Sequence, residues 1–188
     1  LVAALEDRIS LSSRWRGPAS ITIDDPRCYT NGRPWTLSNA SDSEAGTFTL
    51  LQATAHSVNT VYAQLVTVVG PDEVVRVAHR MGIDSPLDPV CSITLGTQEV
   101  TPLEMTRAYA TLAARGVRHD ATPLLEVTDA SGQELGRIDR RGQQVLDPND
   151  ADLATYALRS VITSGTGTRA NIGRPAAGKT GTAQQYVD

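Results

Sequence analysis

"GRPAAGKTGTAQ", residues 173–184, contains the only lysine of a 188-residue chain in which 17 residues are Lys or Arg. Residues 173–180 fit the phosphate-binding pattern G-x-x-x-x-G-K-T. Such a site requires a buried strand before the loop and a helix after it. The residues before Gly173 are polar and rich in glycine, and Gly181 falls where the first helical turn would form. The sequence therefore disfavours nucleotide binding.

A second interpretation places Lys179 at the edge of a β-strand that binds a small anion such as a carboxylate. Alternation along a strand puts Lys179 and Gly181 on one face and Thr180 and Thr182 on the other. Gly181 has no side chain, so a substrate backbone can lie close to it. A Lys-Thr-Gly triplet is also typical of a surface turn, so this interpretation needs support from a second motif.

The bulk properties indicate one soluble globular domain, or part of a larger one. Hydrophobic residues make up 40% of the chain, and the net charge of −4 disfavours binding to nucleic acid. No apolar run is long enough to cross a membrane. The three histidines share no ligand spacing, so we expect neither a metal nor a cofactor. The chain starts with Leu1 inside an apolar stretch and ends soon after Lys179, which indicates a fragment.

The two cysteines, Cys28 and Cys91, are too few for a disulfide framework and do not have metal-site spacing. In an oxidising compartment they could pair, and closing a loop of about 60 residues would stabilise the fold by roughly 4 kcal/mol. Two separate, inert thiols are the favoured interpretation.

Helical patterns dominate the middle of the chain, and strand patterns occur mainly late in it. An apolar face predicts a helix over residues 58–69, with Ser57 as its N-cap. Further helices are expected over residues 1–9, 71–82, 101–116 and 153–162, the third with a capping box at Thr101 and the last capped by Asn149 or Asp150. The sequence predicts a strand over residues 20–23 and a β-hairpin over residues 124–139. This order indicates an α+β arrangement with a mainly antiparallel sheet.

Ser57-Val58-Asn59 is the second motif. Its serine can cap the helix that follows, and Asn59 can project a donor and an acceptor into a cleft. Ser-x-Asn followed about 120 residues later by Lys-Thr-Gly is the order found in serine acyltransferases that recognise β-lactams. Their third motif, Ser-x-x-Lys, carries the nucleophile. It is not in this chain, because Lys179 is the only lysine and Ala176 stands three residues before it.

With these motifs, the chain resembles the transpeptidase domain of class A, bifunctional penicillin-binding proteins. The resemblance is carried by "LVAALEDRI" (1–9), "TLLQATAHSVNTVYAQLVTVVG" (49–70), "LGTQEVTPLEMTRAYATLAARGV" (95–117) and "SGTGTRANIGRPAAGKTGTAQ" (164–184). It implies the α+β fold of penicillin-binding proteins and serine β-lactamases, with an antiparallel sheet and a helical cluster, incomplete at both ends. Residues 1–188 would then be a partial transpeptidase domain, with the nucleophile motif before Leu1 and the last strands after Asp188.

The resemblance implies a D,D-transpeptidase of a peptidoglycan synthase, which cross-links stem peptides through a serine acyl-enzyme and is acylated by β-lactams. Three catalytic residues carry over. Ser57 would relay a proton towards the leaving amine while hydrogen-bonded to Lys179. Asn59 would hold the substrate's amide and orient the lysine of the missing motif.

The substrate-binding residues implied are Thr180, Gly181, Thr182 and Thr166. Thr180 and Thr182 would bind the substrate's terminal carboxylate, and the Thr182 amide would be one of two oxyanion-hole donors. Thr166 would line the cleft behind Ser57, although its Gly-rich surroundings are equally typical of a helix end.

The expected partners are peptidoglycan stem peptides, β-lactams and the missing segments of the same protein, with no nucleic acid. The resemblance places the site at the extracytoplasmic face of the bacterial membrane, anchored by a segment outside this chain. The alternative is a β-lactam-sensing or catalytically inactive binding module on the same fold. Hydrolysis of β-lactams ranks last, because no motif supplies a base to activate a deacylating water.

Overall fold

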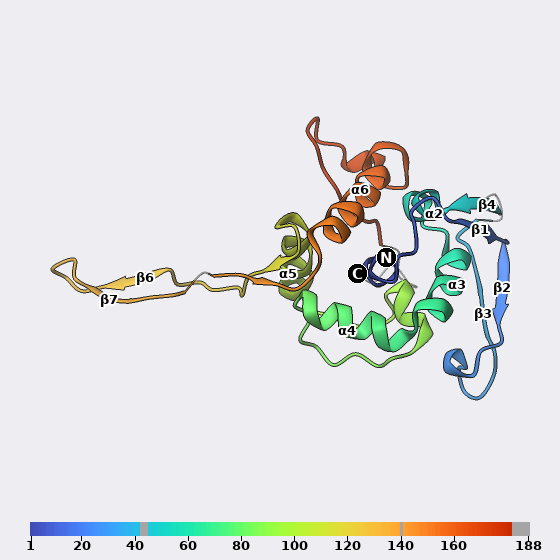
Figure 1. Cartoon of the computed structure of the whole chain (residues 1–188), viewed down its shortest axis with the longest axis horizontal. Coiled ribbons are helices and arrows are strands. Elements are labelled where there is room, and N and C mark those ends of the chain that lie inside the picture. Colours follow the sequence, from blue (N-terminus) through green and yellow to red (C-terminus); the bar gives the residue numbers. More distant parts are fainter. Residues whose placement is uncertain (42–44, 140, 182–188) are drawn as a thin grey trace.

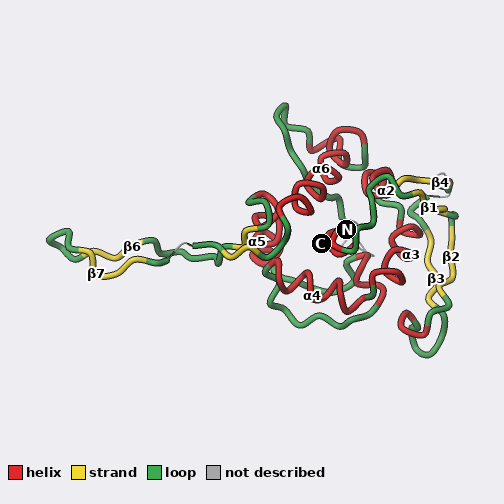
Figure 2. Tube along the Cα trace, in the orientation of Figure 1, coloured by secondary structure: helices red, strands yellow, loops and turns green. Residues whose placement is uncertain are grey.

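The structure is a computed structural model that describes residues 1–41, 45–139 and 141–181. Helix α1 (Val2–Glu6) lies at the centre, and longer helices surround it (Figures 1 and 2). These are α2 (Leu50–His56), α3 (Asn59–Val69), α4 (Pro71–Met81), α5 (Pro102–Ala113) and α6 (Pro148–Ser164). No helix of the described ranges combines the length and apolar character that a membrane crossing requires.

Apolar side chains of α1 join the surrounding helices into one core. The largest buried cluster includes Ala3 and Leu5 of α1, Val77 and Met81 of α4, Ala108 and Leu112 of α5, and Ala151, Ala154 and Leu158 of α6. Ala4 of α1 belongs to a second cluster, with Leu50 of α2 and Leu65 of α3. Three consecutive residues of this short helix are therefore buried against its neighbours.

The strands form four antiparallel pairs rather than one sheet. The pairs are β1 (Arg14–Gly17) with β4 (Gly46–Thr49), β2 (Ser20–Ile23) with β3 (Trp35–Ser38), β5 (Val117–Arg118) with β8 (Gln143–Gln144), and β6 (Glu126–Thr128) with β7 (Glu134–Arg137). The β6–β7 hairpin projects far from the helical body (Figure 1). The predicted strand at 20–23 and the predicted hairpin are confirmed, and the α+β class is confirmed. The expectation of one sheet is not met within the described residues, because each strand has a single partner there.

The helix ends follow local signals in most places. Helix α4 starts at Pro71 and ends before Gly82, which is left-handed, as predicted. The capping box of α5 forms, with the Thr101 amide donating to Glu104 at 2.8 Å and the Glu104 amide donating to Thr101 Oγ1 at 3.2 Å. The predicted cap of α6 is wrong: Asp147 accepts from the Asn149 amide at 2.8 Å, and Pro148 is the first helical residue.

A disulfide joins Cys28 to Cys91, which corrects the favoured interpretation of two separate thiols. Cys28 ends the short helix η1 (Pro26–Cys28) in the β2–β3 connection, and Cys91 begins η3 (Cys91–Leu95). Both are buried together with residues of α3. The separation of 63 residues corresponds to a stabilisation of about 4 kcal/mol from loop closure.

Glu104 connects α5 to the end of α4. Besides Thr101, its carboxylate accepts from the amides of Asp84 and Ser85 and from the Ser85 hydroxyl, at 2.6–2.8 Å. The side chain is buried, with 8% of the residue exposed. These donors, led by the Thr101 amide, lower the pKa of Glu104 to about 2.

Replacing Glu104 with Gln is expected to lower the melting temperature at pH 7 by several degrees, because a neutral amide accepts these hydrogen bonds less strongly. The folded-state pKa lies below the unfolded value of 4.5, so the stabilisation is complete above pH 4.5 and is lost as the pH falls towards about 2. The difference between variant and parent should therefore shrink over that range. Thermal unfolding measured across pH tests this, with Glu99→Gln at an exposed carboxylate as the control. A constant difference at all pH values would contradict it.

Candidate active site

Ser57 lies at a sharp turn between α2 and α3. The residue is left-handed, with φ 58° and ψ 43°, and its backbone amide closes the end of α2 by donating to Ala53 and Thr54. Val58, fully buried against Ala53, becomes the N-cap of α3. Capping serines have extended backbone angles. The prediction that Ser57 caps α3 is therefore wrong, and its hydroxyl remains available for another partner.

That partner is Lys179, 122 positions away in the sequence. The Lys179 ammonium donates a hydrogen bond to Ser57 Oγ at 2.7 Å and a second one to the Thr180 carbonyl at 3.0 Å. The predicted hydrogen bond between the two motifs is thus confirmed. Partial desolvation lowers the pKa of Lys179, although the residue as a whole is exposed. The site brings a hydroxyl and an ammonium group together at an accessible position.

Two contacts hold the segment that carries Lys179. The Gly178 amide donates to the Leu158 carbonyl of α6 at 3.3 Å. The hydroxyls of Thr180 and Thr166 are hydrogen-bonded at 2.6 Å. Thr166, predicted to lie behind Ser57, is itself tied to α2 through its amide, which donates to the Ala55 carbonyl at 3.0 Å. Both motifs therefore rest on the junction between α2 and α6.

Gly165 makes this junction possible, whereas the sequence pattern around it indicated only a helix end. A Cβ atom at this position would lie 2.1 Å from the Ala55 carbonyl oxygen, so no larger residue fits without a shift of the backbone. The glycine between α6 and Thr166 was the available signal. It permits the close approach that positions Thr166.

The remaining predicted residues are placed differently. Asn59, half-buried at the start of α3, donates from Nδ2 to the Ser38 carbonyl at 3.2 Å. Gly181 is exposed, and Thr182 lies outside the described residues. Residues 175–181 form no strand, contrary to prediction, because no described strand pairs with them. A strand exists only through hydrogen bonds to a neighbour.

The structure also bears on the phosphate-loop interpretation. Before Gly173 the chain forms a short 3₁₀ helix, η4 (Thr168–Ala170), instead of the buried strand that such a loop requires. No group of histidine, cysteine, aspartate and glutamate within the described ranges could hold a metal ion.

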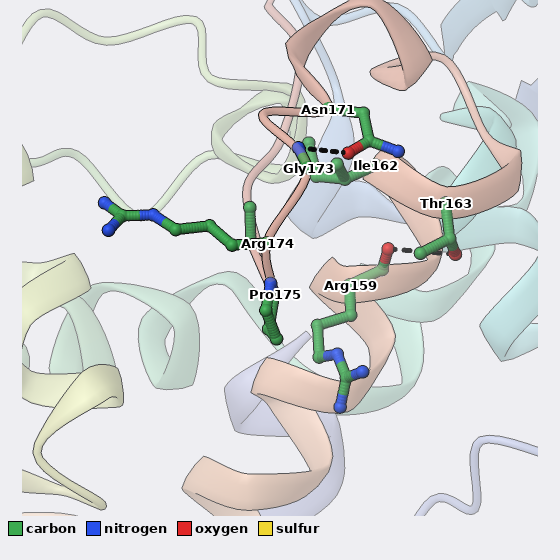
Figure 3. A pocket seen from close by; sticks show the side chains of 8 residues that line it. Arg159, Ile162, Thr163, Asn171, Gly173, Arg174 and Pro175 are labelled. Atoms are coloured by element: carbon green, nitrogen blue, oxygen red, sulfur yellow. Dashed lines mark hydrogen bonds between the residues drawn. The ribbon is translucent and has the colours of Figure 1, made fainter.

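A cavity of about 410 Å³ lies beside the site, between α6 and the loop before Lys179 (Figure 3). Its lining comprises Arg159, Ile162, Thr163, Asn171, Gly173, Arg174, Pro175 and Ala176. The guanidinium groups of Arg159 and Arg174 point away from one another in this view. None of the predicted site residues lines the cavity.

Comparison with protein families identifies the arrangement. The family described as "Penicillin binding protein transpeptidase domain" matches residues 18–188, which include Ser57, Asn59 and Lys179. The chain belongs to this family. The resemblance to class A penicillin-binding proteins is also confirmed by the relatives that match.

Among curated relatives of this penicillin-binding domain, penicillin-binding protein 1A of Aquifex aeolicus is 34% identical over 195 residues, which cover 99% of this chain and 26% of the relative. Penicillin-binding protein 1B of Escherichia coli is 28% identical and covers all of this chain. The chain spans about a quarter of the length of these relatives, 26% and 22% respectively.

Two solved structures share the fold of this penicillin-binding domain. The D,D-transpeptidase domain of a peptidoglycan glycosyltransferase from Eggerthella lenta is 26% identical, with a TM-score of 0.80 over 98% of this chain and 52% of that chain. PonA1 of Mycobacterium tuberculosis, in complex with penicillin V, is 28% identical with a TM-score of 0.72 over 86% of this chain and 44% of that chain.

Proposed function

We propose that this chain forms part of the active site of a serine D,D-transpeptidase that cross-links peptidoglycan stem peptides and is acylated by β-lactams. The observation that carries the proposal is the 2.7 Å hydrogen bond from Lys179 to Ser57, because it unites the two motifs in one accessible site. The relatives support it: one is named as a D,D-transpeptidase domain, and another was solved with penicillin V.

The substrate of this reaction is a peptide that ends in D-Ala-D-Ala and therefore carries a terminal carboxylate. Lys179 offers a positive charge in a net-acidic chain, and the Thr180 hydroxyl lies beside it on an exposed segment. Charge-assisted hydrogen bonds to a carboxylate are about twice as strong as neutral ones. Lys179 and Thr180, with Thr182, would thus hold the end of the substrate, and Gly181 would leave room for its backbone.

Acylation forms an ester bond between a serine oxygen and the carbonyl carbon of the penultimate D-alanine, and breaks the peptide bond to the last D-alanine. The attacking serine gives its hydroxyl proton to the lysine of its own Ser-x-x-Lys motif, and the leaving nitrogen needs a proton in turn. Ser57 accepts a hydrogen bond from Lys179, so it can pass its own hydroxyl proton to that nitrogen and take a replacement from the ammonium. The lowered pKa of Lys179 favours this transfer. The amine of a second stem peptide then takes the acyl group.

The nucleophilic serine of this proposal belongs to a Ser-x-x-Lys motif before Leu1 in the full-length protein. The proposed location is the extracytoplasmic face of the membrane, with the anchor also outside this chain. The Cys28–Cys91 disulfide supports that location, because such bonds persist in oxidising compartments.

Labelling with a fluorescent penicillin tests the proposal. The full-length protein should form a stable covalent adduct on the serine of the Ser-x-x-Lys motif, identified by mass spectrometry of the labelled peptide. The isolated 188-residue chain should remain unlabelled. Absence of an adduct on the folded full-length protein, or an adduct on a serine of this chain, would overturn the proposed mechanism.

A further inference from the structure

Helix α3 starts without a capping side chain of its own. Its N-cap, Val58, has no side-chain acceptor, and Ser57 is left-handed and bonded to Lys179. Buried amides in the first turn of a helix need acceptors from elsewhere. Thr60 is fully buried, so its amide is such a group.

Asn39 supplies the acceptor from a distant part of the chain. It directly follows strand β3, and its Oδ1 accepts from the Thr60 amide at 3.0 Å. Its Nδ2 donates to the Pro18 carbonyl at 3.1 Å, and the same carbonyl accepts from Thr60 Oγ1 at 2.9 Å. Asn39, Pro18 and Thr60 thus hold one another in a closed set of hydrogen bonds.

The neighbouring backbone extends this contact to the catalytic motif. The Ser38 carbonyl accepts from Asn59 Nδ2 at 3.2 Å, and the Asn39 amide donates to the Ala19 carbonyl at 2.9 Å. Residues 38–39 therefore hold both Asn59 and Thr60, which follow Ser57 by two and three positions. The same β2–β3 pair is attached to the core through Cys28 in its connecting loop.

We propose that Asn39 is a positioning residue of the active site, which caps α3 from a separate β-hairpin and so leaves the Ser57 hydroxyl to Lys179. The proposal rests on the function proposed above. A serine that capped α3 would be extended, with its oxygen directed to the helix amides. With the cap supplied by Asn39, residue 57 can be left-handed and its oxygen can face the ammonium group.

Removing the Asn39 side chain leaves the Thr60 amide without this acceptor and the Pro18 carbonyl with one donor fewer. The turn from Ser57 to Asn59 then loses its fixed position. A displacement of about 1 Å at a reacting group can cost about a hundredfold in rate. The effect should therefore appear mainly in the acylation step, with a smaller effect on the first binding of penicillin through Asn59.

The test measures acylation of the full-length protein by a fluorescent penicillin, separating the rate constant of acylation from the dissociation constant of the initial complex. For Asn39→Ala and Asn39→Leu we expect the rate constant to fall at least about tenfold, with the dissociation constant little changed. The melting temperature should fall by a few degrees, because the buried Thr60 amide loses its acceptor. Asn39→Asp keeps the acceptor and should stay within about threefold of the parent, because Asp and Asn cap helices about equally well.

The matched control is Thr22→Ala, which removes an exposed hydrogen bond to Thr36 between β2 and β3 without touching α3. It should acylate at the parental rate. Parental acylation rate constants for Asn39→Ala or Asn39→Leu would overturn the inference. So would an Asn39→Asp rate constant as low as that of Asn39→Ala, or a Thr22→Ala rate constant reduced by the same factor. If Asn39→Ala does not fold, Asn39→Leu, which fills the space of the amide without its acceptor, decides by the same criterion. Failure of the parent to label would count against the proposed function instead.

Discussion

Replacing Lys179 with alanine should reduce acylation of the full-length protein by a fluorescent penicillin about a thousandfold or more. The change removes both the charge proposed to hold the substrate carboxylate and the donor that fixes Ser57 Oγ at 2.7 Å. The loss should appear in both the initial affinity and the rate constant of acylation, because the two functions act at different steps.

Two further variants sharpen this measurement. Lys179→Arg keeps the charge, but a planar guanidinium cannot take the place of a compact ammonium group, so only part of the activity should remain. Arg174→Ala removes a positive charge five residues earlier on the same segment and should leave labelling near the parental level. Parental labelling of Lys179→Ala would remove the role assigned to this residue.

Replacing Ser57 with glycine should lower the acylation rate constant about a hundredfold or more, because the proton relay to the leaving nitrogen is lost. The stability should stay within about 1 kcal/mol of the parent, since glycine adopts the left-handed conformation freely but loses more chain entropy on folding. The Ser57 side chain caps no helix, so its removal costs no cap.

Ser57→Ala separates the loss of the hydroxyl from the change in backbone conformational freedom. It keeps the left-handed strain and lacks the hydroxyl, so its acylation should match that of Ser57→Gly. The measurements are the acylation rate and the thermal unfolding of each variant. A Ser57→Gly protein that reacts at the parental rate would show that another group protonates the leaving nitrogen.

Helix ends set by neighbouring residues were predictable from the sequence. Pro71 and Gly82 delimit α4, and the Thr101–Glu104 capping box starts α5, because these signals act within a few residues. The cap of α6 was misplaced for a local reason: Asp147-Pro148 is itself a strong start signal and precedes the asparagine that had been preferred.

Features that depend on distant residues could not be derived from local patterns. Ser57 was expected to cap α3. Only the structure shows that the cap comes from Asn39, which lies 21 positions before Thr60 in the sequence. The pairing of Cys28 with Cys91 likewise depends on how η1 and η3 meet beside α3. The contact of Lys179 with Ser57 was anticipated through the family resemblance, since no local pattern links residues so far apart.

The disulfide has a practical consequence for handling the protein. The hairpin that fixes the start of α3 is attached to the core through Cys28, so the geometry around Ser57 depends on a bond that forms only after oxidation. Material folded in the cytoplasm of an expression host, or prepared with thiol reagents before the bond has closed, would hold the start of α3 less firmly. Labelling by a fluorescent penicillin measured on such a preparation would understate that of the disulfide-bonded protein.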